Sequence, residues 1–269
     1  MEKISAATFR RQVLTGDALP AGLAVEGSLG LSGCTVLTTL PEGLTVEGSL
    51  YLARCTGLAA LPEGLVVKGS LDLAGCTALT ALPAGLAVEG DLDLAGCMAL
   101  TALPEGLAVG GNLYLNDCPA LTALPAGLAV RGSLYLARCT GLAALPAGLA
   151  VEGDLYLNDC TALTALPAGL AVEGDLDLND CTALTTLPAG LAVGGRLYLA
   201  RCAAGESLSV GMDSRGYRFY RVPMADGIHV VAGCHNFTAN EAREHWAQGT
   251  ECRALAEKCL TGVDAGDGA

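Results

Sequence analysis

The sequence predicts a repeat solenoid, a rod of stacked short coils rich in parallel β-sheet with little helix in the repeats, followed by a small α+β cap. A proline and a cysteine each recur every 21 residues through most of the chain. Repetition at a short fixed period is typical of coils that bury their apolar faces only against their neighbours. The recurring residues are Pro20, Pro41, Pro62, Pro83, Pro104, Pro125, Pro146, Pro167 and Pro188, with Cys34, Cys55, Cys76, Cys97, Cys118, Cys139, Cys160, Cys181 and Cys202.

Within one unit, residues 170–178 alternate between apolar or glycine positions and polar or small ones. This period of two predicts a half-buried strand, with Leu170, Val172, Leu176 and Leu178 pointing inward. Gly174 falls at an inward position, where a chain that turns a corner brings backbone against backbone. A corner is therefore expected at this glycine, between a short strand and the main strand.

The return side of each coil is predicted to be irregular or 3₁₀. Cys181, Leu184 and Leu187 are three residues apart, and Pro188 and Gly190 oppose a helix. The cysteine column contains an odd number of residues and should point into the core, so free buried thiols that donate weakly to the turn backbone are expected. Free thiols indicate a reducing compartment for folding.

The run LxLxxCxxL, at residues 176–184, resembles the cysteine-bearing form of the leucine-rich repeat. The resemblance covers nine units and implies a solenoid. At 21 residues the unit is similar to short bacterial repeats, including those of effectors that pathogens inject into host cells. It leaves no room for a convex helix, so a deep horseshoe is not expected.

Three parts are predicted: a capping helix over residues 1–18, nine repeat units over 19–202, and a C-terminal α+β capping module over 203–269. The first 17 residues place Phe9, Val13 and Leu14 at helical spacing. They lack the apolar core of a signal peptide, so the chain is expected to be cytoplasmic, or exported without a cleaved N-terminal signal.

The C-terminal part carries strand patterns at 210–212, 217–222 and 228–232, separated by turn signals. Thr238 and Glu241 form the pattern of a capping box that opens a helix carrying Trp246, and a second helix is expected from about 250 to 260. The segment VVAGCHNFTANEAREHW resembles a module of uncharacterised bacterial and phage proteins, which implies no activity.

The formal net charge is −13, and residues 20–202 contribute most of it, with 17 acidic against six basic residues. The negative electrostatic field of the repeats opposes binding to nucleic acid and to anionic membranes and favours a basic partner. The same negative charge also keeps a leucine-rich rod in solution. No apolar run is long enough to span a bilayer, for which about 18 residues are needed.

Outward positions of the main strand vary between units, unlike the core positions, and form the candidate binding face for a protein partner. Exposed tyrosines supply contact area at low entropic cost, although β-propensity and cross-strand stacking would also place them there. A neighbouring column is expected to vary as freely; it consists of Ser28, Ser49, Ser70, Asp91, Asn112, Ser133, Asp154, Asp175 and Arg196. The candidate face comprises Tyr51, Asp72, Asp93, Tyr114, Tyr135, Tyr156, Asp177 and Tyr198, with Arg54, Arg138 and Arg201 at the far end of the strand.

Two other functions stay open. The C-terminal part could be an enzyme or a zinc protein with the repeats as a spacer, since Cys234, His235, His245, Cys252 and Cys259 could bind zinc, but their spacing matches no paired motif. The repeats could also be a structural rod without a specific partner. The sequence has no phosphate loop or serine triad, so a non-enzymatic protein without cofactor or metal is expected. Acidic residues around 154–180 are expected to form a solvated patch rather than a calcium site.

Overall fold

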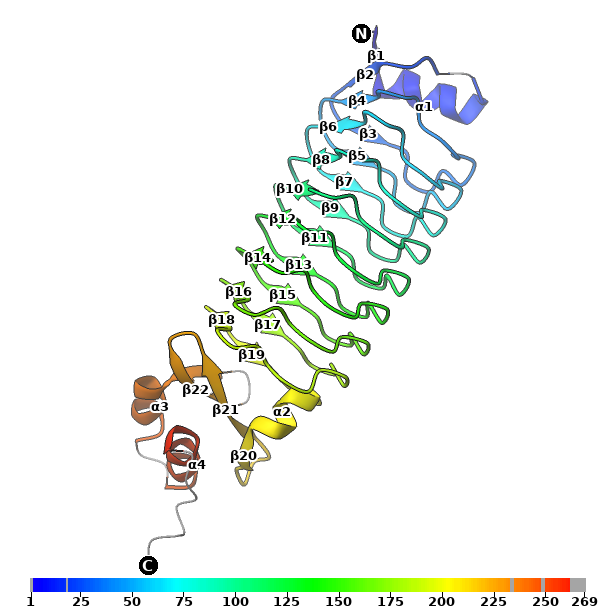
Figure 1. Cartoon of the computed structure of the whole chain (residues 1–269). Helices are drawn as coiled ribbons and strands as arrows, with labels where there is room; N and C mark the ends of the chain where they lie inside the picture. The colour runs from blue at the N-terminus through cyan, green and yellow to red at the C-terminus, as the bar shows by residue number, and fades with distance from the viewer. Residues whose placement is uncertain (1, 18, 233–234, 248–249, 262–269) are drawn as a thin grey trace, which may run out of the picture.

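The computed structural model describes residues 2–17, 19–232, 235–247 and 250–261. Within these ranges the chain is a parallel-sheet β-solenoid of about nine turns, followed by a small α+β part (Figure 1). The predicted fold class is confirmed. Each coil contributes one short strand to each of two parallel sheets and then returns through a longer turn.

The first sheet has ten strands among the described residues, and neighbouring coils pair in register. Its strands are β1 (Glu2–Ser5), β2 (Leu23–Glu26), β4 (Thr45–Val46), β6 (Val66–Val67), β8 (Ala87–Val88), β10 (Ala108–Val109), β12 (Ala129–Val130), β14 (Ala150–Val151), β16 (Ala171–Val172) and β18 (Ala192–Val193).

The second sheet holds nine strands in the described part of the chain and carries the candidate binding face. Its strands are β3 (Leu29–Gly30), β5 (Leu50–Tyr51), β7 (Leu71–Asp72), β9 (Leu92–Asp93), β11 (Leu113–Tyr114), β13 (Leu134–Tyr135), β15 (Leu155–Tyr156), β17 (Leu176–Asp177) and β19 (Leu197–Tyr198).

The corner between the two sheets depends on glycine. A Cβ added to Gly174 would lie only 2.8 Å from the carbonyl carbon of Gly153 in the preceding coil. The four side chains predicted to point inward around it, from Leu170 to Leu178, are buried. The predicted alternation and corner are therefore confirmed. The return side consists of turns with isolated bridges such as Ala123 to Ala144, and no 3₁₀ helix occurs in the described residues.

The N-terminal end is covered by a strand and a helix. The predicted helix is α1 (Ala6–Thr15), which Ser5 caps by accepting the N–H of Thr8, and its Phe9 is fully buried against the end of the solenoid core. The prediction of helix from residue 1 was wrong at its start, because residues 2–5 form β1, which pairs with β2. The edge of β2 offers unpaired backbone groups that a strand satisfies and a helix does not.

The C-terminal part packs its four-stranded sheet between the last coil and two helices. The capping box of Thr238 and Glu241 is confirmed, and Trp246 directly follows the helix α3 (Ala239–His245). Tyr220 and Val222 join the solenoid core, and the N–H of Ala225 donates to the carbonyl of Leu191 at 2.8 Å. The sequence did not predict the helix α2 (Ala203–Leu208) or the strand β23 (His235–Thr238). The elements are α2 (Ala203–Leu208), β20 (Ser209–Met212), β21 (Arg218–Met224), β22 (Gly227–Ala232), β23 (His235–Thr238), α3 (Ala239–His245) and α4 (Thr250–Thr261).

Candidate functional site

The second sheet presents the predicted tyrosine and aspartate column to solvent. In every strand the leucine is fully buried while the following residue stays at least partly exposed, as in Leu155 and Tyr156. Tyr51 is the most open of the column's tyrosines, with 42% of its surface exposed. The column therefore lies outside the core, where the sequence placed it.

Three tyrosines in adjacent coils form one stack. The ring centroids of Tyr114 and Tyr135 are 4.6 Å apart, and those of Tyr135 and Tyr156 are 4.9 Å apart, with nearly parallel planes. These distances match the spacing of parallel strands, about 4.8 Å, so the backbone register sets the stacking. Because the rings cover one another's faces, a partner would meet their edges and hydroxyl groups.

The polar neighbours of the stack differ from ring to ring. Asn112 Nδ2 donates to the hydroxyl of Tyr114 at 3.2 Å, whereas the hydroxyl of Tyr156 donates to Asp154 Oδ2 at 3.2 Å. Burial, with the nearby Asp154 carboxylate as a second cause, raises the pKa of Tyr156 to about 12. Tyr156 is therefore an uncharged phenol at neutral pH.

Aspartates flank the tyrosine stack on both sides. In Asp72, Asp93 and Asp177, Oδ1 accepts the backbone N–H of the residue two positions later, at distances of 2.9–3.0 Å. Burial raises the pKa of Asp93 and Asp177, although this hydrogen bond opposes the shift. These carboxylates thus combine a local structural role with negative charge beside the aromatic rings.

Replacing Asp93 by Asn is expected to stabilise the folded chain at neutral pH, by less than about 1 kcal/mol because the carboxylate is partly exposed. The pKa of Asp93 is higher in the folded chain than in the unfolded one, so stability falls as pH rises through the interval between the two values. Asn keeps a side-chain oxygen that can accept the N–H of Ala95 and avoids the cost of partly burying a charged carboxylate. Urea unfolding at pH 7 and at about pH 3 would measure the difference, which should vanish at the lower pH.

The control for this substitution is Glu152→Gln, which removes the same charge from an exposed side chain at a sheet corner. It should leave the free energy of unfolding nearly unchanged at both pH values. A stabilisation by Asp93→Asn that persists at the lower pH, or that Glu152→Gln reproduces, would contradict the assignment to the partly buried Asp93 carboxylate.

The column beside the tyrosines, expected to vary freely for recognition, has a structural role instead. Each side-chain oxygen accepts the N–H of the equivalent residue in the next coil, as when Asp154 Oδ1 accepts from Asp175 N at 2.8 Å and Ser133 Oγ from Asp154 N at 2.9 Å. The chain breaks its sheet pairing at the corner, and these oxygens satisfy the exposed donors. Only acceptors fit there, which explains the restriction to Ser, Asp and Asn up to Asp175.

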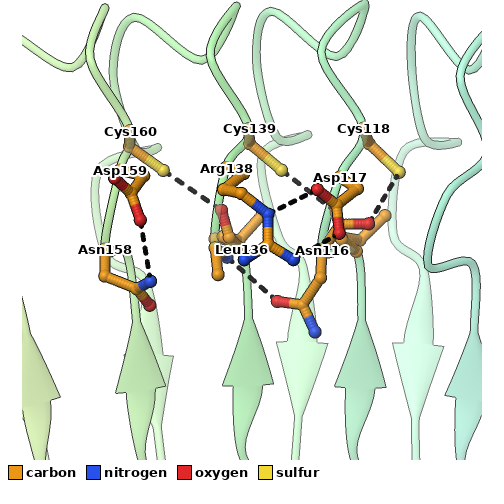
Figure 2. A network of polar contacts seen from close by, with 11 residues as sticks. Asn116, Asp117, Cys118, Leu136, Arg138, Cys139, Asn158, Asp159 and Cys160 are labelled. Atoms are coloured by element: carbon orange, nitrogen blue, oxygen red, sulfur yellow. Dashed lines mark hydrogen bonds and ion pairs between the residues drawn. The ribbon is translucent and has the colours of Figure 1, made fainter.

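The arginine column lies at a backbone position with left-handed φ, between 55° and 61° for Arg54, Arg138 and Arg201. Arg138 forms a two-bonded ion pair with Asp117 of the preceding coil, at 2.5 and 2.6 Å (Figure 2), and Arg201 pairs with Asp180 in the same way. Arg54 lies between Gly33 and Gly75 and forms no ion pair within the described residues. Two of the three predicted arginines are thus partly neutralised.

The cysteine column is an interior ladder of thiols. Cys139 Sγ donates to the carbonyl of Leu115 at 3.0 Å and Cys160 Sγ to that of Leu136 at 3.1 Å, and the same bond recurs in the other central coils (Figure 2). All the described cysteines are free. Burial raises the pKa of Cys139 to about 12 and holds the ladder as thiols, as predicted.

The C-terminal candidates for zinc do not converge. Cys259 is fully buried in the core of the C-terminal part, Cys252 lies 3.6 Å from Arg215 Nη2, and the rings of His235 and His245 lie 6.0 Å apart. Cys234 lies outside the described residues. Within the described residues, no three His, Cys, Asp or Glu side chains are arranged to hold a metal ion.

The described helices are short, and none of them is long and apolar enough to cross a membrane. The chain has no significant match to a protein-family model, to a curated protein or to a solved structure.

Proposed function

We propose that the chain is a non-enzymatic scaffold that binds a protein partner through the outer face of its second sheet. The observation that carries the proposal is the stack of Tyr114, Tyr135 and Tyr156, flanked by Asp93 and Asp177 on a rigid parallel sheet. Aromatic residues on a preorganised surface bind with little loss of conformational entropy. The excess of acidic over basic residues in the repeats favours a partner with a basic surface.

We further propose that the repeats are of the leucine-rich-repeat kind, in a short bacterial form similar to that of effectors. Support comes from the LxLxxCxxL run and from its cysteine, which bonds to the carbonyl of the preceding coil. The free thiols favour folding in a reducing compartment such as a cytoplasm, before any export.

The proposal can be tested with a photoreactive amino acid, p-benzoylphenylalanine, placed at position 135. Irradiation in candidate host and bacterial lysates should join the chain to one partner, which mass spectrometry then identifies. The same probe at position 140, on the return side of the same coil, is the control and should not capture that protein. Capture from both positions, or from neither, would contradict a specific partner and favour the alternative of a structural rod.

The captured protein would then be purified and its affinity measured by calorimetry. The triple variant Tyr114→Ser, Tyr135→Ser, Tyr156→Ser should bind at least about 30-fold more weakly, as expected when hot-spot residues worth about 2 kcal/mol are lost. The matched control replaces three exposed threonines on the return side: Thr140→Ala, Thr161→Ala and Thr182→Ala. Equal binding by both variants would place the interface elsewhere, and far-UV circular dichroism would verify that both are folded.

A further inference from the structure

A second candidate site lies in the C-terminal part, in a cavity of about 230 Å³ between the sheet and the end of α3. Its wall includes Arg215, Tyr217, His235, Phe237, His245 and Trp246. Drug-sized ligands occupy pockets of about 300–1,000 Å³. This cavity is therefore suited to a single ring or a pair of fused rings.

The wall offers flat aromatic surfaces around Phe237. The rings of His235 and Phe237 are stacked, with their centroids 5.4 Å apart and an angle of only 2° between their planes. The ring centroid of His245, on α3, lies 4.7 Å from that of Phe237. Trp246 meets Phe237 edge-on at 4.9 Å. Such a cluster favours a planar ligand, because a flat ring can stack on one wall and contact another with its edge.

Arg215 supplies a cation held in a fixed orientation at the same cavity. Its Nε and Nη2 bond to Asp213 Oδ2 at 3.0 and 2.7 Å, and the Asp213 side chain is wholly buried. The guanidinium carbon lies 5.1 Å from the centre of the Tyr217 ring, and 64% of the Arg215 side chain is exposed. Since Nη1 takes part in none of these bonds, it can donate to a ligand.

The lining of the cavity lacks the excess of acidic residues found in the rest of the chain. The net charge of the chain is −13, whereas the described lining of the cavity includes the guanidinium of Arg215 and no carboxylate. Asp213, which pairs with Arg215 and offsets part of its charge, does not line the cavity. Glu241 and Glu244 line a separate shallow hollow with Phe237 and His245. A negatively charged group is thus favoured on the Arg215 side of the cavity.

We propose that this cavity binds a small planar aromatic molecule that carries an acidic group. The ring lies against Phe237 and its neighbours, and the acidic group accepts a hydrogen bond from Nη1 of Arg215. An aromatic carboxylate and a nucleotide share this chemistry, and they would differ in whether the anion is attached directly to the ring or through a sugar. This site is independent of the tyrosine face on the solenoid.

The test uses the intrinsic fluorescence of Trp246, which is the only tryptophan in the chain and belongs to the cavity wall. The full-length protein is titrated with benzoate and with adenosine 5′-monophosphate, each beside its uncharged counterpart, benzamide or adenosine. One acid should quench Trp246 saturably and bind about tenfold more tightly than its counterpart, as one charge-assisted hydrogen bond implies. The acid that binds more tightly shows whether the ligand is an aromatic carboxylate or a nucleotide.

Arg215→Gln should weaken that binding about tenfold, whereas Arg253→Gln, which removes the same charge from exposed α4, should change it by less than about twofold. Loss of Arg215 leaves the buried Asp213 carboxylate without its cation, so a second variant that keeps this pair is needed. His245 is exposed, and His245→Gln should weaken binding about threefold or more. The absence of saturable quenching by either acid would overturn the proposal. Equal affinity for acids and uncharged counterparts, or unchanged binding by both cavity variants, would do the same.

Discussion

Replacing Leu155 by Ala is expected to lower the free energy of unfolding by about 2–5 kcal/mol. Leu155 lies in β15 at the middle of the solenoid, paired in register with Leu134 and Leu176, and all three side chains have no exposed surface. Truncation removes buried apolar contacts and leaves a cavity that in-register neighbours on both sides cannot fill. The stability of a solenoid depends on the interfaces between adjacent coils, so a central defect weakens two interfaces at once.

Urea unfolding followed by far-UV circular dichroism would measure this loss. The matched control is Leu14→Ala, the same chemical change at a side chain of α1 that is 61% exposed. It should alter the free energy of unfolding by no more than about 0.5 kcal/mol. Similar losses for the two variants would mean that burial in the stacked leucine column is not the main source of stability.

Replacing Gly153 by Ala should cost about 2–3 kcal/mol, because the corner brings two backbones into contact. An added Cβ would lie 2.8 Å from both the carbonyl carbon of Gly132 and the backbone nitrogen of Ser133. Neither atom can move without displacing the preceding coil. This steric cost differs from the cost of an unfavourable φ, since Gly153 has no left-handed φ.

Two neighbouring positions separate these effects. Gly148 has a φ of +73° and open space around it, so Gly148→Ala should cost about 1 kcal/mol from backbone strain alone. Glu152→Ala changes an exposed side chain beside the corner and should stay within about 0.5 kcal/mol. If Gly148→Ala destabilised the protein more than Gly153→Ala, close approach of the coils would not be the reason for glycine at the corner.

The sequence predicted the coil well because its signals are local and repeat in every unit. Alternation over residues 170–178, the corner glycine and the buried thiols each follow from one unit read alone. The features that it missed depend on contacts between units. The strand β1 forms because β2 has an open edge, and the Ser, Asp and Asn column is constrained because each member accepts an N–H from the following coil.

At the candidate face, the sequence placed the tyrosines correctly outside the core but did not predict the ion pairs of Arg138 and Arg201. The left-handed backbone at this column could have been predicted, because three of its nine positions hold glycine, namely Gly33, Gly75 and Gly96. Glycine recurring at one position indicates a left-handed turn. The aromatic cavity gave no such signal, since its wall combines β23, which was not predicted, with the end of α3.

The corner column also bears on where an additional coil could be accommodated in the rod. Each coil accepts an N–H from the next one through Ser, Asp or Asn, until Asp175 accepts from the N–H of Arg196 at 2.7 Å. The Arg196 side chain has only donors, so a further coil appended after it would find no acceptor at its corner. A duplicated unit inserted upstream brings its own acceptor. A coil inserted within the array therefore keeps the corner bonds complete, whereas a coil appended after Arg196 would lack this acceptor.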